Sequence, residues 1–204
     1  MTAVRPDRRV STIIACTAVA VTAFAGINVF HAFGPIHLHN DGPLVLGAAG
    51  ITFDAGSTGP STIGYQPCVN QGTDPVILEG IAPVSATGDG LQFLGAFTRL
   101  IPADTGGAIG SEAGFPPHVL QVLQPVAGFA VTQQCNFNSD TPPVPTSTSE
   151  IDVGVGKPVG STGGGWPGYA VTYRVGSTQY VVTLDGPVYI CGPTAPAAAQ
   201  CNHP

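Results

Sequence analysis

The chain has 204 residues, of which 43% are hydrophobic and only 9% are charged, and its formal net charge at pH 7 is −6. Because lysine and arginine together total six residues, no basic patch is available for a phosphate backbone, and we expect no nucleic-acid partner. The 28 glycines and 20 prolines are poor helix formers, so beyond the amino-terminal segment we expect no long helices and an all-β fold.

The first 33 residues are predicted to direct export. Arg5, Arg8 and Arg9 precede residues 10–30, a run without charged side chains. In one interpretation this is a cleaved signal peptide, with a small–x–small cleavage site ending at Ala25. In the other, the run is long enough to remain as a single transmembrane anchor whose basic end faces the cytoplasm. Both interpretations place the rest of the chain outside the cytoplasm, either secreted or attached to the membrane.

A histidine-rich segment follows, with His31, His37 and His39. On an extended strand His37 and His39 would project from the same face, where two imidazoles can hold a metal such as zinc or copper. The alternative is a polar junction between the export segment and the domain. His37 and His39 are therefore a candidate metal site, and no other cofactor is expected.

Residues 34–204 are predicted to form a single extracytoplasmic β-domain. Short apolar runs alternate with Gly, Pro, Asn and Asp clusters about every ten residues, which is typical of an antiparallel β-sandwich, with an immunoglobulin-like architecture favoured. The predicted strands before the last part of the chain are 44–46, 50–53, 76–83, 91–101, 119–123, 127–134 and 151–155. Between them, residues 138–149 are rich in Pro, Ser and Thr and predict an exposed loop.

Near the carboxyl end the pattern predicts a three-strand meander. Residues 169–175 alternate apolar and polar side chains with period two, as in a strand with one buried face. Gly176 and Ser177 then predict a two-residue hairpin turn with Gly at its first central position. The partner strands are expected at 179–184 and 188–191.

Four cysteines after the apolar run predict two disulfides, as is usual in an exported chain. Cys135 and Cys191 each end a predicted strand, so we favour a Cys135–Cys191 bond, which leaves Cys68 to pair with Cys201. None of the spacings is that of a zinc ribbon or a redox-active CxxC pair.

Two further features bear on ligand binding. Trp166 lies in a Gly-rich segment, where its ring could stack on a sugar or a partner, or could fold back onto the sandwich. Arg99 and Arg174 lie in predicted strands, and we expect them to pair with carboxylates at a sheet face rather than hold an anionic ligand.

The sequence favours a non-enzymatic binding or structural role in the cell envelope, with an unidentified extracellular or envelope partner. The Gly-x-Ser-x-Gly elbow and the His-Glu-x-x-His motif of common hydrolases are both missing. Two alternatives remain open. One is an extracytoplasmic hydrolase on a similar β-sandwich, and the other is a metal-handling exported protein that uses His31, His37 and His39.

Overall fold

A computed structural model describes residues 40–47, 50–102, 109–135, 147–196 and 201. All the regular structure in this part of the chain is β, arranged in three sheets, which confirms the all-β prediction. The described residues contain no helix with the length and apolarity needed to cross a membrane. The predicted signal or anchor, residues 1–33, lies outside the described residues.

The large sheet has the strand order β1-β3-β10-β6-β8. β1 pairs with residues 66–69 of β3, and β7 pairs with residues 61–63 along the same edge. β10 is central because it pairs antiparallel with β3 on one side and with β6 on the other. The strands are β1 (Leu44–Gly47), β3 (Gly59–Val69), β6 (Gln92–Pro102), β7 (Ser111–Ala113), β8 (Gln124–Pro125) and β10 (Ser147–Lys157).

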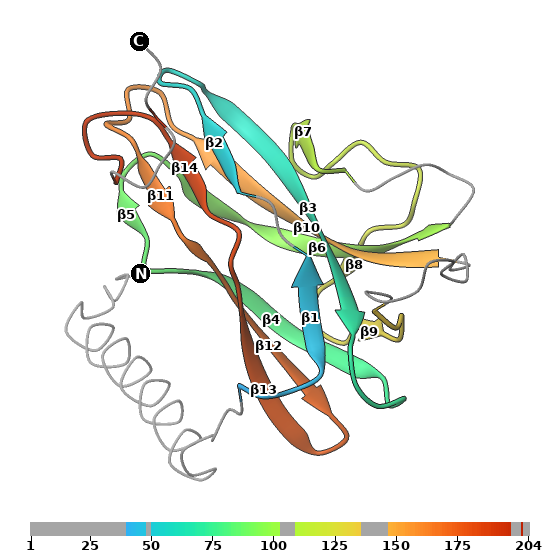
Figure 1. The fold of residues 1–204 in the computed structure, drawn as a ribbon. Coiled ribbons are helices and arrows are strands. Elements are labelled where there is room, and N and C mark those ends of the chain that lie inside the picture. The colour runs from blue at the N-terminus through green and yellow to red at the C-terminus, as the bar shows by residue number, and fades with distance from the viewer. Residues whose placement is uncertain (1–39, 48–49, 103–108, 136–146, 197–200, 202–204) are drawn as a thin grey trace, which may run out of the picture. The chain divides into compact units, whose positions relative to one another are not determined.

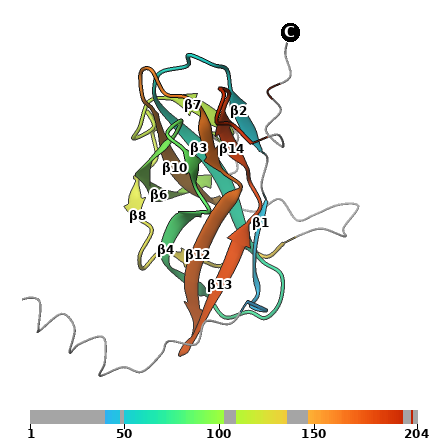
Figure 2. The ribbon, with the colours of Figure 1, turned by 90° about the vertical axis from the view of Figure 1, so that its left-hand side faces the viewer.

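The hairpin sheet has the order β13-β12-β4-β9, and its strands are all antiparallel. It contains β4 (Val76–Val84), β9 (Ala130–Val131), β12 (Gly168–Val175) and β13 (Thr178–Leu184). Gly176 has a positive φ of 58° and Ser177 does not, as the predicted turn requires. The hairpin of β12 and β13 is therefore confirmed, and Figure 2 shows β4, β12 and β13 side by side.

The small sheet has the order β2-β14-β11-β5 and contains the parallel pair β2–β14. Its strands are β2 (Ile51–Phe53), β5 (Thr87–Gly88), β11 (Gly164–Trp166) and β14 (Val188–Ile190). The strand predicted at 188–191 is confirmed as β14, but its place in a meander is wrong, because β14 leaves β13 and inserts between β2 and β11. All three of its residues are buried, as expected for a strand with neighbours on both sides.

One hydrophobic core joins the large sheet to the hairpin sheet. Alternate residues in the middle of β3 and β10 contribute to it, including Ile63, Tyr65 and Val153, and β12 adds Tyr169 and Val171. These side chains share a face because successive residues of a strand point to opposite sides. The period-two pattern of residues 169–175 therefore marked the core face of β12 correctly.

Other strand predictions need correction. Residues 119–123 are irregular, and residues 127–134 form a strand only at Ala130–Val131. β3 was not predicted, because Pro60 and Pro67 interrupt its pattern. The predicted loop 138–149 ends early: 136–146 lie outside the described residues, whereas Ser147–Ser149 begin β10 and pair with residues 100–102 of β6.

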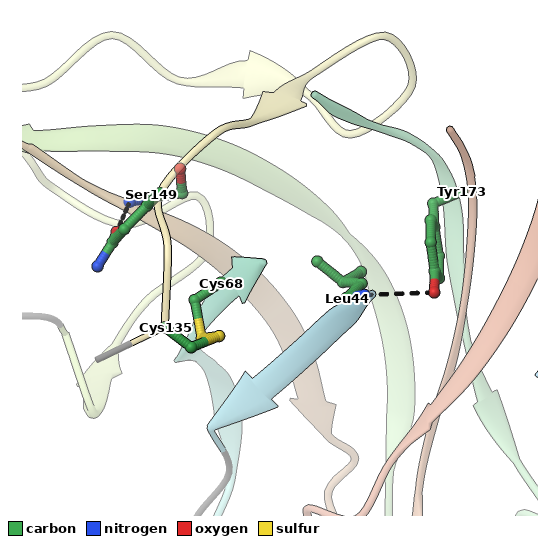
Figure 3. The surroundings of a disulfide bond; sticks show 6 residues. Leu44, Cys68, Cys135, Ser149 and Tyr173 are labelled. Carbon is green, nitrogen blue, oxygen red and sulfur yellow. Dashed lines mark hydrogen bonds between the residues drawn. A yellow bond between two sulfur atoms is a disulfide. The ribbon is translucent and has the colours of Figure 1, made fainter. Parts of the chain in front are cut away.

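The four cysteines form two disulfides, but their pairing differs from the expected one. Cys68 bonds to Cys135 and Cys191 bonds to Cys201. Residues 133–135 run beside the end of β3: the Val69 N–H donates to the Gln133 carbonyl, and the Cys135 N–H donates to the Val69 carbonyl. Cys135 therefore lies next to Cys68 (Figure 3). The predicted Cys135–Cys191 bond was wrong because β14 belongs to the small sheet, whereas Cys135 is fixed to the large one.

Candidate functional site

Residues 109–125, here called the covering segment, lie over the face of the large sheet that points away from the core. Their two ends are fixed because β7 pairs with β3 and β8 pairs with β6 (Figure 1). Between these ends, the Phe115 ring stacks on Phe97 with a centroid distance of 5.6 Å. The same ring lies against Gly154 so closely that a side chain there would collide with it. β10 is consequently buried on both of its faces.

Beneath the covering segment lies a charge cluster of Arg99, Glu150 and Asp152. Glu150 is directly opposite Arg99 in the β6–β10 ladder, and Asp152 follows two residues later on the same face. The guanidinium donates through Nη2 to Glu150 and through Nε to Asp152 Oδ2 at 3.1 Å. Arg99 is 3% exposed and both carboxylates are fully buried. The sheet register thus builds this cluster from residues that are far apart in sequence.

The charge cluster also holds the covering segment. Arg99 Nη1 donates to Gln121 Oε1 at 2.7 Å, and the backbone N–H of Ile109 donates to Glu150 Oε1 at 2.8 Å. Removing one member of a buried ion pair leaves an uncompensated charge, so each contact depends on the others. The expectation that arginines pair with carboxylates at a sheet face is confirmed at Arg99, and also at Arg174, which lies 3.7 Å from Glu79.

The cluster contains two carboxyl groups for one guanidinium. Burial and the negative charge of Glu150 raise the pKa of Asp152 to about 7, against the lowering effect of Arg99. Its Oδ1 atom has no hydrogen-bond partner among the described residues. Because the three side chains are buried and bond to one another and to the covering segment, we interpret the cluster as a structural clamp.

A second polar pair, Ser61 and Lys157, lies at one end of the core-facing side of β3 and β10. Lys157 Nζ donates to Ser61 Oγ at 2.5 Å and lies 4.2 Å from the centroid of the Phe53 ring. The two residues are 5% and 8% exposed. Burial lowers the pKa of Lys157, and no carboxylate among the described residues offsets this effect. This pair has the chemical character of a hydroxyl next to a desolvated amine.

Trp166 lies in the core and not on an exposed loop. It belongs to β11, which pairs with β14 and β5, and its side chain is 1% exposed. Its ring packs edge-on against Tyr169 with a centroid distance of 5.9 Å, and Tyr65 also packs edge-on against Tyr169 at 5.5 Å. With no ring face accessible, the position of Trp166 gives no support to ligand stacking and agrees with the alternative of a side chain folded into the core.

The candidate metal ligands His31, His37 and His39 lie outside the described residues. Within the part of the chain that the structure describes, His, Cys, Asp and Glu side chains form no group of three or more that could hold a metal ion. The charge cluster and the Ser61–Lys157 pair were not predicted as sites. No local signal identifies them, because each joins residues more than 50 positions apart.

Comparisons with protein-family models, with curated proteins and with solved structures gave no match.

Replacement of Arg99 by Met is expected to destabilise the protein strongly. It leaves Glu150 and Asp152 buried without a cation, which typically costs about 3–5 kcal/mol. The matched control is Arg174→Met, whose ion pair with Glu79 is half exposed and should contribute about 0–1 kcal/mol. Urea denaturation measures both free energies of unfolding. Equal losses in the two variants would contradict the clamp interpretation.

The raised pKa of Asp152 predicts that the stability of the protein depends on pH. Its pKa is raised to about 7 in the folded protein and is about 4 in the unfolded chain, so the folded state holds the extra proton between these values. The contribution of this group to the free energy of unfolding therefore falls as pH rises from about 4 to about 7. Asp152→Asn should flatten this part of the stability profile. Denaturation curves across this range should show no such change in Asp54→Asn, an exposed control.

Proposed function

We propose that this chain is an exported or membrane-anchored β-domain of the cell envelope with a non-enzymatic binding or structural role. Residues 1–33 serve as its signal peptide or anchor, and the domain works outside the cytoplasm. Two disulfides support this location, since such bonds persist in oxidising compartments. The core shared by the large and hairpin sheets supports an antiparallel sandwich, whose immunoglobulin-like form stays a prediction.

The observation that carries the binding role is the display of two apolar side chains by the covering segment. Leu120 is fully exposed and Val122 is 77% exposed, whereas Gln121 between them turns inward to Arg99. The hydrogen bond from Arg99 to Gln121 therefore anchors the backbone between the two exposed apolar residues.

Such a display favours recognition of a partner. Apolar side chains held in one conformation lose little entropy on binding, and their burial contributes about 25 cal/mol per Å² removed from water. Two exposed apolar side chains suit a partner with an apolar pocket, because a few buried anchor residues carry most of the affinity of an interface. The partner is thus an extracellular or envelope protein that accepts Leu120 and Val122.

The test places a photo-reactive amino acid at position 120 of the protein in its native host. A discrete crosslinked product is expected in the envelope or the medium, because this residue is fully exposed at the proposed contact. The matched control is position 159, where Val159 is 87% exposed but lies in a different turn. The crosslink should diminish when Val122→Ser is added to the chain. Equal crosslinking from both positions, or none from position 120, contradicts the proposal.

The Ser61–Lys157 pair favours a second candidate function, an extracytoplasmic hydrolase. We propose that neutral Lys157 accepts the Ser61 proton while Oγ bonds to the carbonyl carbon of an ester or amide. The leaving group departs with that proton, and water then releases the acyl group from Oγ. The short Nζ–Oγ contact and the lowered lysine pKa support this role, as in serine–lysine enzymes.

A fluorophosphonate probe distinguishes the two functions, because it forms an oxygen–phosphorus bond with an activated serine and releases fluoride. The hydrolase candidate requires labelling of Ser61 that is lost in Ser61→Ala and reduced at least tenfold in Lys157→Met. Ser111→Ala is the matched control, since Ser111 is an exposed residue of the adjacent β7. If peptide mapping finds no label on Ser61, the hydrolase candidate fails and the binding role is unaffected.

A further inference from the structure

β13 is the one long strand that ends a sheet among the described residues. The other terminal strands are short: β1 has four residues, β2 and β7 have three, and β5, β8 and β9 have two. β13 has seven residues, Thr178–Leu184, and none of them is charged, Gly or Pro. The unpaired backbone groups of an edge strand attract other strands. Proteins therefore usually keep edge strands short or place Lys or Pro in them. β13 has none of these protections.

The free backbone groups of β13 follow from its hairpin. In a two-residue hairpin the residues that close the turn exchange both backbone hydrogen bonds, and bonded pairs then alternate along the ladder. Val175 pairs with Thr178, so the N–H and C=O groups of Gln179, Val181 and Thr183 point away from β12. No described strand pairs with them. β1 approaches β13 from the core side, where Leu44 N donates to the Tyr173 hydroxyl, and does not join its ladder.

The outward edge is complementary to itself. If two copies meet antiparallel with a two-fold axis at Val181, then Val181 faces Val181 and Gln179 faces Thr183 of the other copy. Each of these three pairs exchanges two backbone hydrogen bonds, giving about six across the contact. Because the strand is uncharged, no like charges are brought opposite each other.

We propose that β13 is a self-association edge, and that two copies of this chain pair their β13 strands antiparallel about Val181. The two hairpin sheets then form one continuous sheet with closed two-fold symmetry, which leaves neither β13 edge open. In Figure 2, β13 is the outer strand of the β4-β12-β13 group. The net charge of −6 opposes this contact, so added salt should strengthen it.

The test is sedimentation of the full chain, in mild detergent where the apolar run is retained, from about 1 to 100 µM. The wild type is expected to show a monomer–dimer equilibrium. Val181→Lys and Val181→Glu should each weaken the dimer at least tenfold, because like charges then meet at the two-fold axis. An equimolar mixture of the two variants should recover dimers, since opposite charges face each other. Thr52→Lys, an exposed position on the short edge strand β2, should dimerise like the wild type.

A second variant guards against loss of the fold. Thr183→Pro removes an outward N–H and leaves the β12 ladder intact, so it should abolish the dimer and keep the wild-type circular dichroism spectrum. A wild type that is monomeric at all concentrations overturns the proposal, whether its edge is covered by other parts of the chain or waits for a different partner. Dimers that tolerate Val181→Lys, or that do not return in the mixture, also overturn it.

Discussion

The buried ion pairs that the Arg99 guanidinium forms with Glu150 and Asp152 are the interaction on which the rest of this structure depends. Arg99 lies on β6, forms hydrogen bonds with two carboxyl groups on β10 and donates to Gln121 in the covering segment. A cation in this position allows the central strand of the large sheet to be buried on both faces although one face carries Glu150 and Asp152. Without it, two carboxylates in a dry environment would favour exposure to water and would expel the covering segment.

The surface of the domain follows from this buried arrangement. Phe115 and Gln121 anchor the covering segment to the sheet, and Leu120 and Val122, on either side of Gln121, face the solvent. Leu120 and Val122, the proposed partner-binding residues, are therefore positioned by the buried charge cluster, which a partner does not contact. In the same way, the Ser61–Lys157 pair depends on the register of β3 and β10 and not on a loop. Both candidate sites depend on β10, one through its pairing with β6 and the other through its pairing with β3.

Local patterns predicted the local structure well. The β12–β13 hairpin was predictable because its two strands alternate regularly and Gly176 supplies the positive φ of the turn. Prediction failed where a residue's neighbours come from distant sequence. The disulfide pairing depends on which sheet each strand joins, and Arg99 meets Glu150 only through the ladder of β6 and β10. Residues 119–123 were mistaken for a strand because the pattern assumes that apolar side chains point inward, and Leu120 points into water.

The central place of β10 also orders the events of folding. β3 and β6 precede β10 in the chain, yet they are not neighbours in the finished sheet, since β10 lies between them. Their facing edges find native partners only when residues 147–157 pair with both. Cys68 and Cys135 are both present by then, so their bond can form before the sheet closes. The chain is consequently most vulnerable to non-native pairing of β3 with β6 before β10 inserts between them.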